Sequence, residues 1–361
     1  MKEQYLKSYM ASNGYSPIKI MTQYFLYPFI FGGARHYDWF SEKGYGKPKE
    51  HESTDAFENF MVAQRKPGAI YHNAFNGLNV KRDFINSKLA HSIFNESEEK
   101  DVKECNIETI NFSSSDINSP FQKHMICFHG AGKAHWQPYM RGLALTAKNL
   151  NINVHSFNYP GIAGSTGEIY EFNDLVNSGI AVVNSLLTQG KDPGNIVLQG
   201  HCVGSNVALA VKNFFAKEHG VELKLLMFDA PKSLSHITVD TIDNIIKFLP
   251  SSVLEFLSSF IDFLLQNAGW VVISEDFQTT ETQVHFYQGD NNLSINIEHT
   301  LHYNELCSQN ELITQIYNNR FLVPKKSLSE DSGNTHFYSF RDLQTEEGIL
   351  ALEQLRKFIL S

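Results

Sequence analysis

A cysteine between two glycines is the first feature of this sequence that could carry chemistry. An apolar run over residues 196–198 leads into Gly200-His201-Cys202-Val203-Gly204, and a second apolar stretch follows. This pattern is typical of a strand that passes into a helix with almost no loop, because small residues leave room for the sharp corner. A side chain at that corner projects above the sheet edge, where it can reach a substrate. The pattern therefore indicates a nucleophile at Cys202; the plain alternative is a glycine-rich turn with a buried cysteine.

Strands and helices alternate along the part of the chain that contains this corner. Apolar runs predict buried strands, and the stretches between them have helical periodicity. The predicted strands span residues 124–128, 154–158, 196–201, 223–228, 284–288 and 321–323, and the predicted helices span about 137–150, 172–188, 203–218 and 345–360. The pattern at 105–112 predicts a half-exposed edge strand. This order is typical of an α/β fold with a mostly parallel sheet, helices on both faces and ligands beyond the carboxyl ends of the strands.

Two parts of the chain do not follow this alternation. Residues 1–101 show no repeat, and we expect loops and short helices that wrap the core. Residues 237–280 contain two strongly apolar helices separated by Pro250-Ser251-Ser252, which we expect to form a cap-like insertion. The second of these helices is apolar on more than one face, so it is either fully buried or lies over an apolar pocket.

The order of four segments along the chain resembles the α/β-hydrolase superfamily. The segments are His129-Gly130-Ala131-Gly132, the turn-rich residues 158–167, the corner at Cys202, and a strand end at Gly289-Asp290 followed by His336 in a late loop. The resemblance covers residues 102–361 and implies an α/β-hydrolase fold for them, with 237–280 as a helical cap and 1–101 as an N-terminal extension. The sequence departs from the usual pattern because Cys202 replaces the nucleophilic serine.

The resemblance also implies the groups that work with Cys202. The base is His336, and the oxyanion hole consists of the backbone N–H groups of Val203 and Ala131. A helix N-terminus and a neighbouring imidazole both favour a thiolate. His129 is expected to hold its own loop by hydrogen bonds.

Three residues are candidates for the third member of the triad. Asp290 carries a charge but lies one residue after the strand-ending Gly289, whereas the family's register points to Asn292. An asparagine can orient the histidine of a Cys-His pair, as in papain-like proteases. Some hydrolases place the acid after the preceding strand instead, where this chain has Asp229. The sequence leaves the choice open.

Together these residues predict a hydrolase that acts on ester, thioester or amide bonds through a Cys-His-(Asp/Asn) triad and an acyl-enzyme. Two alternatives stay open. A thioester intermediate is easily passed to another acceptor, which would make the protein an acyltransferase. The change from Ser to Cys and the open acid position also fit a catalytically inactive, hydrolase-like binding or signalling protein.

The charge and the motifs of the sequence indicate which classes of partner and cofactor to expect. The chain has 361 residues and a net charge of −9, without a stripe of lysine or arginine, which argues against a nucleic-acid partner. The sequence has neither metal-ligand spacing nor a phosphate-binding loop, so we expect no cofactor and no metal. The apolar cap and the aromatic residues 18–31 favour a small-molecule or lipid-like acyl substrate. Membrane contact by residues 18–31 is an alternative to ordinary packing.

The location of the protein has two hypotheses. Four cysteines without disulfide-like spacing, and an N-terminus without the apolar core of a signal peptide, predict a cytoplasmic protein. The long N-terminal segment and the turn at 159–161 are also similar to those of hydrolases that intracellular bacteria deliver into host cells. Glu346-Glu347 near an apolar C-terminus would suit such an export signal, although the same residues suit an ordinary last helix. Delivery into a host cell without a cleavable signal peptide, as a bacterial effector, is the second hypothesis.

Overall fold

The described part of the chain is built around one twisted sheet. The computed structural model describes residues 70–75, 78–88, 104–113, 122–130, 140–162, 171–228 and 250–267, with shorter pieces at 164–167, 230–231, 284–289, 321–323 and 355–360 and a few single residues. Within these residues the sheet has nine strands in the order β1-β2-β3-β5-β4-β6-β7-β8-β9. The strands are β1 (Ile70–Phe75), β2 (Leu78–Lys88), β3 (Glu104–Ser113), β4 (His124–Phe128), β5 (Asn153–Phe157), β6 (Ile196–His201), β7 (Lys224–Phe228), β8 (Val284–Gly289) and β9 (Phe321–Val323).

The direction and the order of the strands define the fold. Strands β5, β4, β6, β7, β8 and β9 are mutually parallel, whereas β1, β2 and β3 pair antiparallel at the other end of the sheet. Strand β4 lies between β5 and β6, so the chain moves outward in one direction and then in the other. Ligands of such sheets bind beyond the carboxyl ends at this reversal. The chain has the α/β-hydrolase fold, and the predicted mostly parallel sheet is confirmed.

The antiparallel end of the sheet differs from our expectation in two ways. Strand β3 is not an edge strand, because β2 pairs along its whole length and β5 pairs on its other side. Its apolar side chains do not all point to one face of the sheet: Ile107 packs in the core on one face, and Ile110 packs in the core on the other. Strands β1 and β2 come from the segment that we expected to wrap the core with loops and short helices. Within the described residues the sheet begins at Ile70, and the expectation for residues 1–69 lies outside them.

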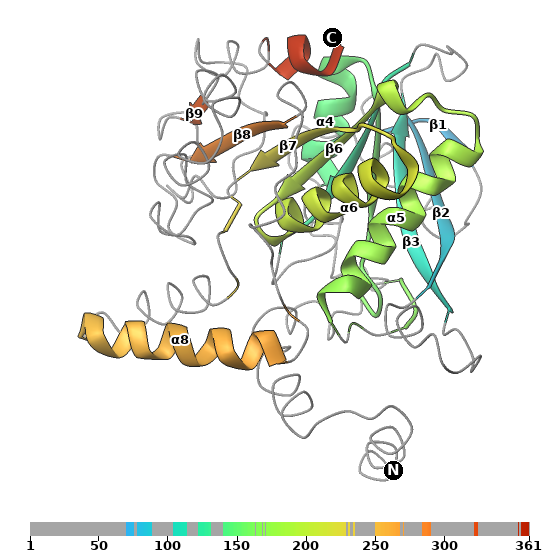
Figure 1. Cartoon of the computed structure of the whole chain (residues 1–361). Coiled ribbons are helices and arrows are strands. Elements are labelled where there is room, and N and C mark those ends of the chain that lie inside the picture. The colour runs from blue at the N-terminus through green and yellow to red at the C-terminus, as the bar shows by residue number, and fades with distance from the viewer. Residues whose placement is uncertain are drawn as a thin grey trace.

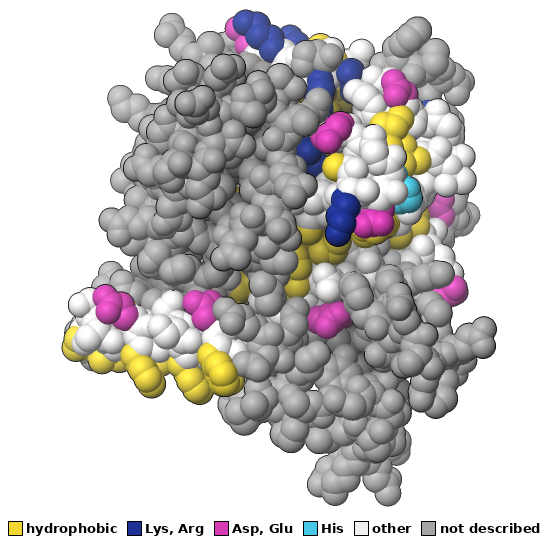
Figure 2. Space-filling model, viewed as in Figure 1, with side chains coloured by type: hydrophobic (Ala, Val, Ile, Leu, Met, Phe, Trp, Pro, Cys, Tyr) yellow, Lys and Arg dark blue, Asp and Glu magenta, His cyan; other side chains and the backbone are white. Residues whose placement is uncertain are grey.

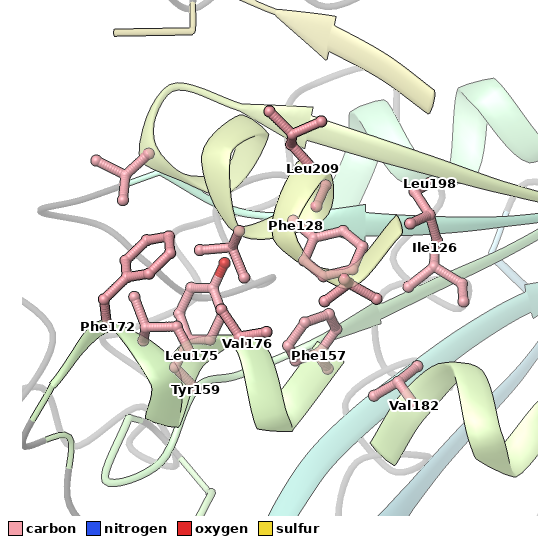
Figure 3. Packing of buried hydrophobic residues seen from close by; sticks show 14 of the residues in the cluster. Ile126, Phe128, Phe157, Tyr159, Phe172, Leu175, Val176, Val182, Leu198 and Leu209 are labelled. Carbon is pink, nitrogen blue, oxygen red and sulfur yellow. The ribbon is translucent and has the colours of Figure 1, made fainter. Parts of the chain in front are cut away.

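Helices cover both faces of the sheet, as predicted. Helices α5 (Phe172–Thr188) and α6 (Val203–His219) lie on one face, and α4 (Met140–Leu150) lies on the other with the helical residues 355–360 (Figure 1). The face under α5 and α6 carries the larger core, in which aromatic rings from β4 and β5 pack against aliphatic residues of α5 (Figure 3). The rings of Phe128 and Phe157 meet edge to face with their centroids 5.1 Å apart, a favoured geometry for aromatic pairs.

The helix ends follow from local chemistry. The carboxylate of Asp174 accepts a hydrogen bond of 3.1 Å from the N–H of Glu171, which closes the first turn of α5. Helix α6 ends at His219 and is capped by Gly220, whose φ of 61° is the left-handed conformation that glycine adopts at helix C-termini.

The expected apolar insertion is described in part. Helix α8 (Ser251–Asn267) matches the second predicted helix, and the first lies outside the described residues. Ile261 and Leu265 are buried in the larger core, while other large apolar side chains of α8 are exposed. The two-faced pattern therefore corresponds to a helix that packs by one face only. Among the described helices, none is long and apolar enough to cross a membrane.

Two histidines on the neighbouring strands β4 and β5 form a partly buried contact. Nδ1 of His124 lies 3.0 Å from Nε2 of His155, and the amide of Asn153 donates a hydrogen bond of 2.9 Å to Gln122 beside them. Burial, together with the nearby Lys191, lowers the pKa of His124 to about 4. Burial, His124 and Lys191 lower the pKa of His155 to about 3. Both imidazoles are thus neutral near pH 7, and one donates while the other accepts.

This pair predicts a loss of stability in mild acid. Because the folded-state pKa values lie below the ordinary value of 6.5, the unfolded chain takes up protons first as the pH falls from 6.5 toward 4. We expect each histidine to lower the free energy of unfolding by about 1 kcal/mol per pH unit in this window, and the pair by about 2 kcal/mol per pH unit. Urea unfolding of wild type and of His124→Gln/His155→Asn at pH 7.5, 6.0 and 5.0 measures it. An equally steep acid loss in the double variant would contradict the prediction, and His219→Gln at an exposed helix end is the matched control.

Candidate active site

Cys202 occupies the corner between β6 and α6. It directly follows the last residue of the strand and directly precedes the first residue of the helix. Its backbone has φ 54° and ψ −128°, a conformation that residues with a Cβ rarely adopt. Among the described residues other than glycine, only Asn151 also has a positive φ. The sharp turn predicted from the sequence is therefore present, and it holds Cys202 in a strained conformation.

The glycines two residues before and two after Cys202 are required by close packing. A Cβ at Gly200 would lie 2.6 Å from the carbonyl oxygen of Gly204, inside the contact distance of any real side chain. A Cβ at Gly204 would lie 2.6 Å from the carbonyl oxygen of His129, which follows β4. The start of α6 thus lies directly against the ends of β6 and β4, and no larger residue fits at either position.

Hydrogen bonds to β7 and to the residues that follow it hold the corner in place. The N–H of Cys202 donates to the carbonyl oxygen of Phe228, the last residue of β7, at 2.8 Å. The hydroxyl of Ser205 donates to the same oxygen at 3.0 Å, and the amide of Asn206 donates to the carbonyl oxygen of Pro231 at 3.1 Å. Ser205 is fully buried, so this hydroxyl serves the packing of α6 on β7.

The corner places Cys202 at the positive end of a long helix. Helix α6 has 17 residues, and Val203 is its first, so the N–H of Val203 has no acceptor within the helix. The partial positive charge at this helix end favours an anion beside it. The arrangement can therefore stabilise an oxyanion that develops beside the N–H of Val203. Cys202 is buried, with 5% of its surface exposed.

The turn after β4 packs directly on Cys202. A Cβ on Gly130 would lie 2.9 Å from the Cβ of Cys202 and 3.2 Å from the carbonyl oxygen of His201. The ring of His129 is buried and makes a short hydrogen bond with the hydroxyl of Ser156 on β5. His129 thus holds the turn by a hydrogen bond, as expected. Ala131, the predicted second oxyanion donor, lies outside the described residues.

Tyr159 ties this turn to the loop that follows β5. Its hydroxyl donates to the carbonyl oxygen of His129 at 3.2 Å, and its ring packs edge to face on Phe157. The side chain lies among other buried residues (Figure 3), in the core that also contains Cys202. Burial, and then the neighbouring Cys202, raise the pKa of Tyr159 above its usual range, so the phenol stays a hydrogen-bond donor. Tyr159 therefore supports the wall beside Cys202 without titrating.

A buried carboxyl group on β3 holds the same loop. Glu108 is fully buried and pairs with Arg82 of β2, with 2.7 Å between its Oε1 and the guanidinium Nε. Its Oε2 accepts a hydrogen bond of 2.6 Å from the amide of Asn158 and another of 2.9 Å from the N–H of Gly164. A Cβ at Gly164 would lie 2.6 Å from the Glu108 carboxyl carbon, so the loop lies directly against it. One charged side chain thus satisfies three donors from two segments.

Ser165 completes this attachment through the backbone. Its hydroxyl accepts a hydrogen bond of 2.8 Å from the N–H of Glu108 and donates one of 2.8 Å to the carbonyl oxygen of Asn158. Thr166 continues the contact, because its hydroxyl accepts from the N–H of Asn106 at 2.8 Å. Hydrogen bonds from both side chains and backbone therefore attach the loop over residues 158–167 to β3.

The other predicted site residues lie outside the described residues. They are His336, Asp290, Asn292, Asp229 and Ala131. Two of them directly follow described strand ends in sequence: Asp229 comes after Phe228 of β7, and Asp290 comes after Gly289 of β8. Both strands run parallel to β6, so their carboxyl ends are at the edge of the sheet that carries Cys202. The base and the acid of the triad stay predictions.

Sequence reasoning missed Glu108, Arg82 and Tyr159 as residues that shape the site. A signal for Glu108 was present, since a glutamate interrupts the apolar residues of a strand and a buried carboxyl group needs partners. The identity of its partners depends on the pairing of β2 with β3, which no local pattern encodes. Within the described residues, no group of three or more His, Cys, Asp or Glu side chains could hold a metal ion.

Comparison with known proteins gives one family match. The family described as "Chlamydia CHLPS protein (DUF818)" matches residues 133–317, which include the corner at Cys202 and helix α8. No curated protein matches the sequence.

Several solved structures are similar at low identity. An esterase from the hyperthermophilic archaeon Pyrobaculum calidifontis is 13% identical, with 84% of this chain and 89% of that chain covered and a TM-score of 0.48. A thermostable esterase from Pseudomonas putida is 14% identical, with 91% and 95% covered and a TM-score of 0.46. An α/β hydrolase from Vibrio vulnificus is 17% identical, with 77% and 90% covered and a TM-score of 0.45. The fold assignment above rests on the strand order and the corner.

The strain at Cys202 predicts an unusual order of stability among its variants. Replacement by glycine removes the Cβ and relieves the positive φ, whereas replacement by alanine retains the strain. We expect Cys202→Gly to be more stable than Cys202→Ala by about 1 kcal/mol, although glycine normally costs about 0.5–1 kcal/mol relative to alanine. Chemical unfolding of the two variants measures the difference. A less stable glycine variant would show that the corner is not strained.

The buried ion pair predicts a large cost for removing one partner. Glu108→Gln can still accept from Asn158 and Gly164 but leaves the buried guanidinium of Arg82 without its counter-charge. We expect it to lower the free energy of unfolding by about 3 kcal/mol, with part of the loss recovered in Glu108→Gln/Arg82→Met.

The exposed ion pair on the same strand is the matched control for this prediction. Nζ of Lys81 lies 2.6 Å from Oδ2 of Asp83, and the two side chains are 38% and 43% exposed. Asp83→Asn should therefore cost less than about 1 kcal/mol. Equal costs for Glu108→Gln and Asp83→Asn in urea unfolding would refute the role of burial.

Proposed function

Because the chain belongs to the family described as Chlamydia CHLPS protein (DUF818), whose description states no activity, we propose its function from the fold and from Cys202. The proposed function is a cysteine-dependent hydrolase that acts on ester, thioester or amide bonds. The observation that carries the proposal is the backbone of Cys202, held at φ 54° between two glycines that admit no side chain. Strain of this kind costs free energy and persists where a side chain must be presented to a reactant.

The proposed reaction proceeds through a covalent intermediate. The thiolate of Cys202 attacks the carbonyl carbon of the substrate, and the negative charge on the carbonyl oxygen is stabilised by the N–H groups of Val203 and Ala131. The bond to the leaving group breaks, and that group takes a proton from the imidazolium of His336. Water then attacks the thioester and gives its proton to His336. The carbon–sulfur bond breaks, which releases the acid and restores the thiolate.

The described contacts support a rigid environment for this chemistry. Tyr159 and Ser156 hold the turn after β4 through His129, and Glu108 holds the loop from Asn158 to Gly164. These side chains form hydrogen bonds with the backbone and with one another. In the proposed reaction the substrate is therefore contacted by Cys202 and by the N–H groups beside it. Transfer of the acyl group to an acceptor other than water uses the same intermediate and is the alternative outcome of the same chemistry.

Alkylation of the thiol tests the proposal. We expect iodoacetamide at pH 7 to modify Cys202 faster than Cys105 or Cys127, as measured by mass spectrometry of peptides. Burial and then Asp174 raise the pKa of Cys105 to about 11, and burial raises the pKa of Cys127 still further, so both are internal controls. His336→Ala should slow the modification of Cys202 by about tenfold or more, and His299→Ala, a residue without an assigned role, is the matched control.

The same assay separates the open alternatives. Single variants Asp290→Ala, Asn292→Ala and Asp229→Ala identify the third member of the triad as the one whose loss slows modification together with hydrolysis of a soluble thioester. Cys202→Ala should abolish that hydrolysis. Slow modification of Cys202 that does not respond to His336→Ala would favour the catalytically inactive binding protein and would overturn the proposed function.

A further inference from the structure

Helix α8 presents an apolar stripe to solvent on the face opposite its packed one. The stripe consists of Val253, Phe256, Phe260 and Phe263, with exposed fractions of 39%, 70%, 48% and 54%. The spacing of three, four and three residues puts all four side chains on one side of the helix. Figure 2 shows hydrophobic side chains gathered along one edge of α8. Scattered apolar residues are normal on protein surfaces, whereas a continuous row marks an interaction site.

The opposite side of α8 shows that this exposure is not a failure to pack. Ile261 and Leu265 are buried in the core that also contains Cys202 and Val203, and Leu254 packs against the same core. The helix is therefore held in place by one apolar side while the phenylalanine stripe faces outward. The rings of Phe256 and Phe260 are nearly parallel, with centroids 6.4 Å apart, so the stripe is ordered along the helix.

The charges on α8 restrict what can cover the stripe. The helix carries Glu255 and Asp262 and neither lysine nor arginine. In Figure 2 the acidic side chains lie on the edge away from the stripe. The whole chain has a net charge of −9. A negatively charged partner, such as a nucleic acid or an anionic lipid surface, would be repelled, and a neutral partner would not.

The area of the stripe argues against a second copy of the chain. Three phenylalanines, each about half exposed, offer roughly 300–400 Å² of apolar surface. A stable protein interface needs about 800 Å² from each partner, with matching shape. A lipid layer has no fixed shape to match and accepts phenylalanine side chains of an amphipathic helix at the level of the headgroups.

We propose that α8 docks the protein on a neutral, zwitterionic lipid surface, with Val253, Phe256, Phe260 and Phe263 inserted and the helix axis parallel to the membrane. This interaction is separate from the proposed hydrolysis and does not require it. It also differs from the membrane contact expected at residues 18–31. Because the bound helix carries no cation, its affinity should depend little on salt and should not increase with anionic lipid.

Flotation with lipid vesicles tests the proposal on the full-length chain. Wild type should float with phosphatidylcholine vesicles at both 50 and 500 mM salt, and Phe256→Ser/Phe260→Ser/Phe263→Ser should lower the partition coefficient by about tenfold or more. The substituted side chains are exposed, and circular dichroism verifies that the variant is folded. Leu360→Ser is the matched control, because Leu360 is 51% exposed on the C-terminal helix and should leave binding unchanged.

A second measurement locates the inserted face without relying on loss of binding. Phe260→Trp should add fluorescence that brominated phosphatidylcholine quenches, whereas Glu255→Trp on the other edge should add fluorescence that it does not quench. Wild type that stays at the bottom of the gradient, or a triple variant that floats like wild type, overturns the proposal. Self-association that the triple variant abolishes, without vesicle binding, would assign the stripe to a second copy instead.

The catalytic variant keeps this test apart from the proposed function. Cys202→Ala should float like wild type, because Cys202 is not on α8. A Cys202→Ala variant that floats but does not hydrolyse the thioester would support both proposals, because membrane docking and catalysis would then depend on different residues. Intact hydrolysis of a soluble thioester without flotation would overturn the lipid surface alone.

Discussion

The absence of space between β6 and α6 is the constraint on which the described structure depends. Gly204 lies against the end of β4, and Gly200 lies against the first turn of the helix. That close approach forces Cys202 into a positive φ and aims the start of α6 at the edge where the parallel strands end. The bonds from Cys202 and Ser205 to Phe228 then extend the same contact to β7. The strain at Cys202 and the close packing of the two glycines therefore have the same cause, the short distance between β6 and α6.

The loop after β5 shows how a buried charge can organise a site from below. Burial of an ion pair such as Glu108 with Arg82 gives little net stability, because the desolvation of both charges offsets their attraction. The role of the pair is to orient the loop, because the fixed carboxylate of Glu108 accepts hydrogen bonds from Asn158 and Gly164 at the same time. Through Tyr159 and His129 this orientation reaches the turn that touches Cys202. Removing Glu108 would thus disturb the site from a strand that β5 and β4 separate from β6.

The sequence predicted the parallel half of the sheet well, because each strand there is a continuous apolar run and each helix has a clear period. Helix α5 has the predicted bounds, and the corner at Cys202 was predicted from five residues. Strand β3 was predicted, but β1 and β2 were missed because β2 carries Lys81, Arg82 and Asp83 and its place depends on pairing with β3. For the same reason Glu108 could be noticed but its partners could not. The triad partners of Cys202, the division into domains and the location of the protein stay predictions.

The last helical residues have a role that affects when the end of the chain can be recognised. Leu355, Phe358 and Ile359 are buried under α4, Lys224 donates to the carbonyl oxygen of Phe358 at 3.0 Å, and Arg356 donates to the carbonyl oxygen of Asn149 at 2.7 Å. A receptor that reads these apolar residues competes with the second core for the same side chains. Access to these side chains would therefore require the segment to leave the sheet, either before the chain folds or while a partner keeps it open.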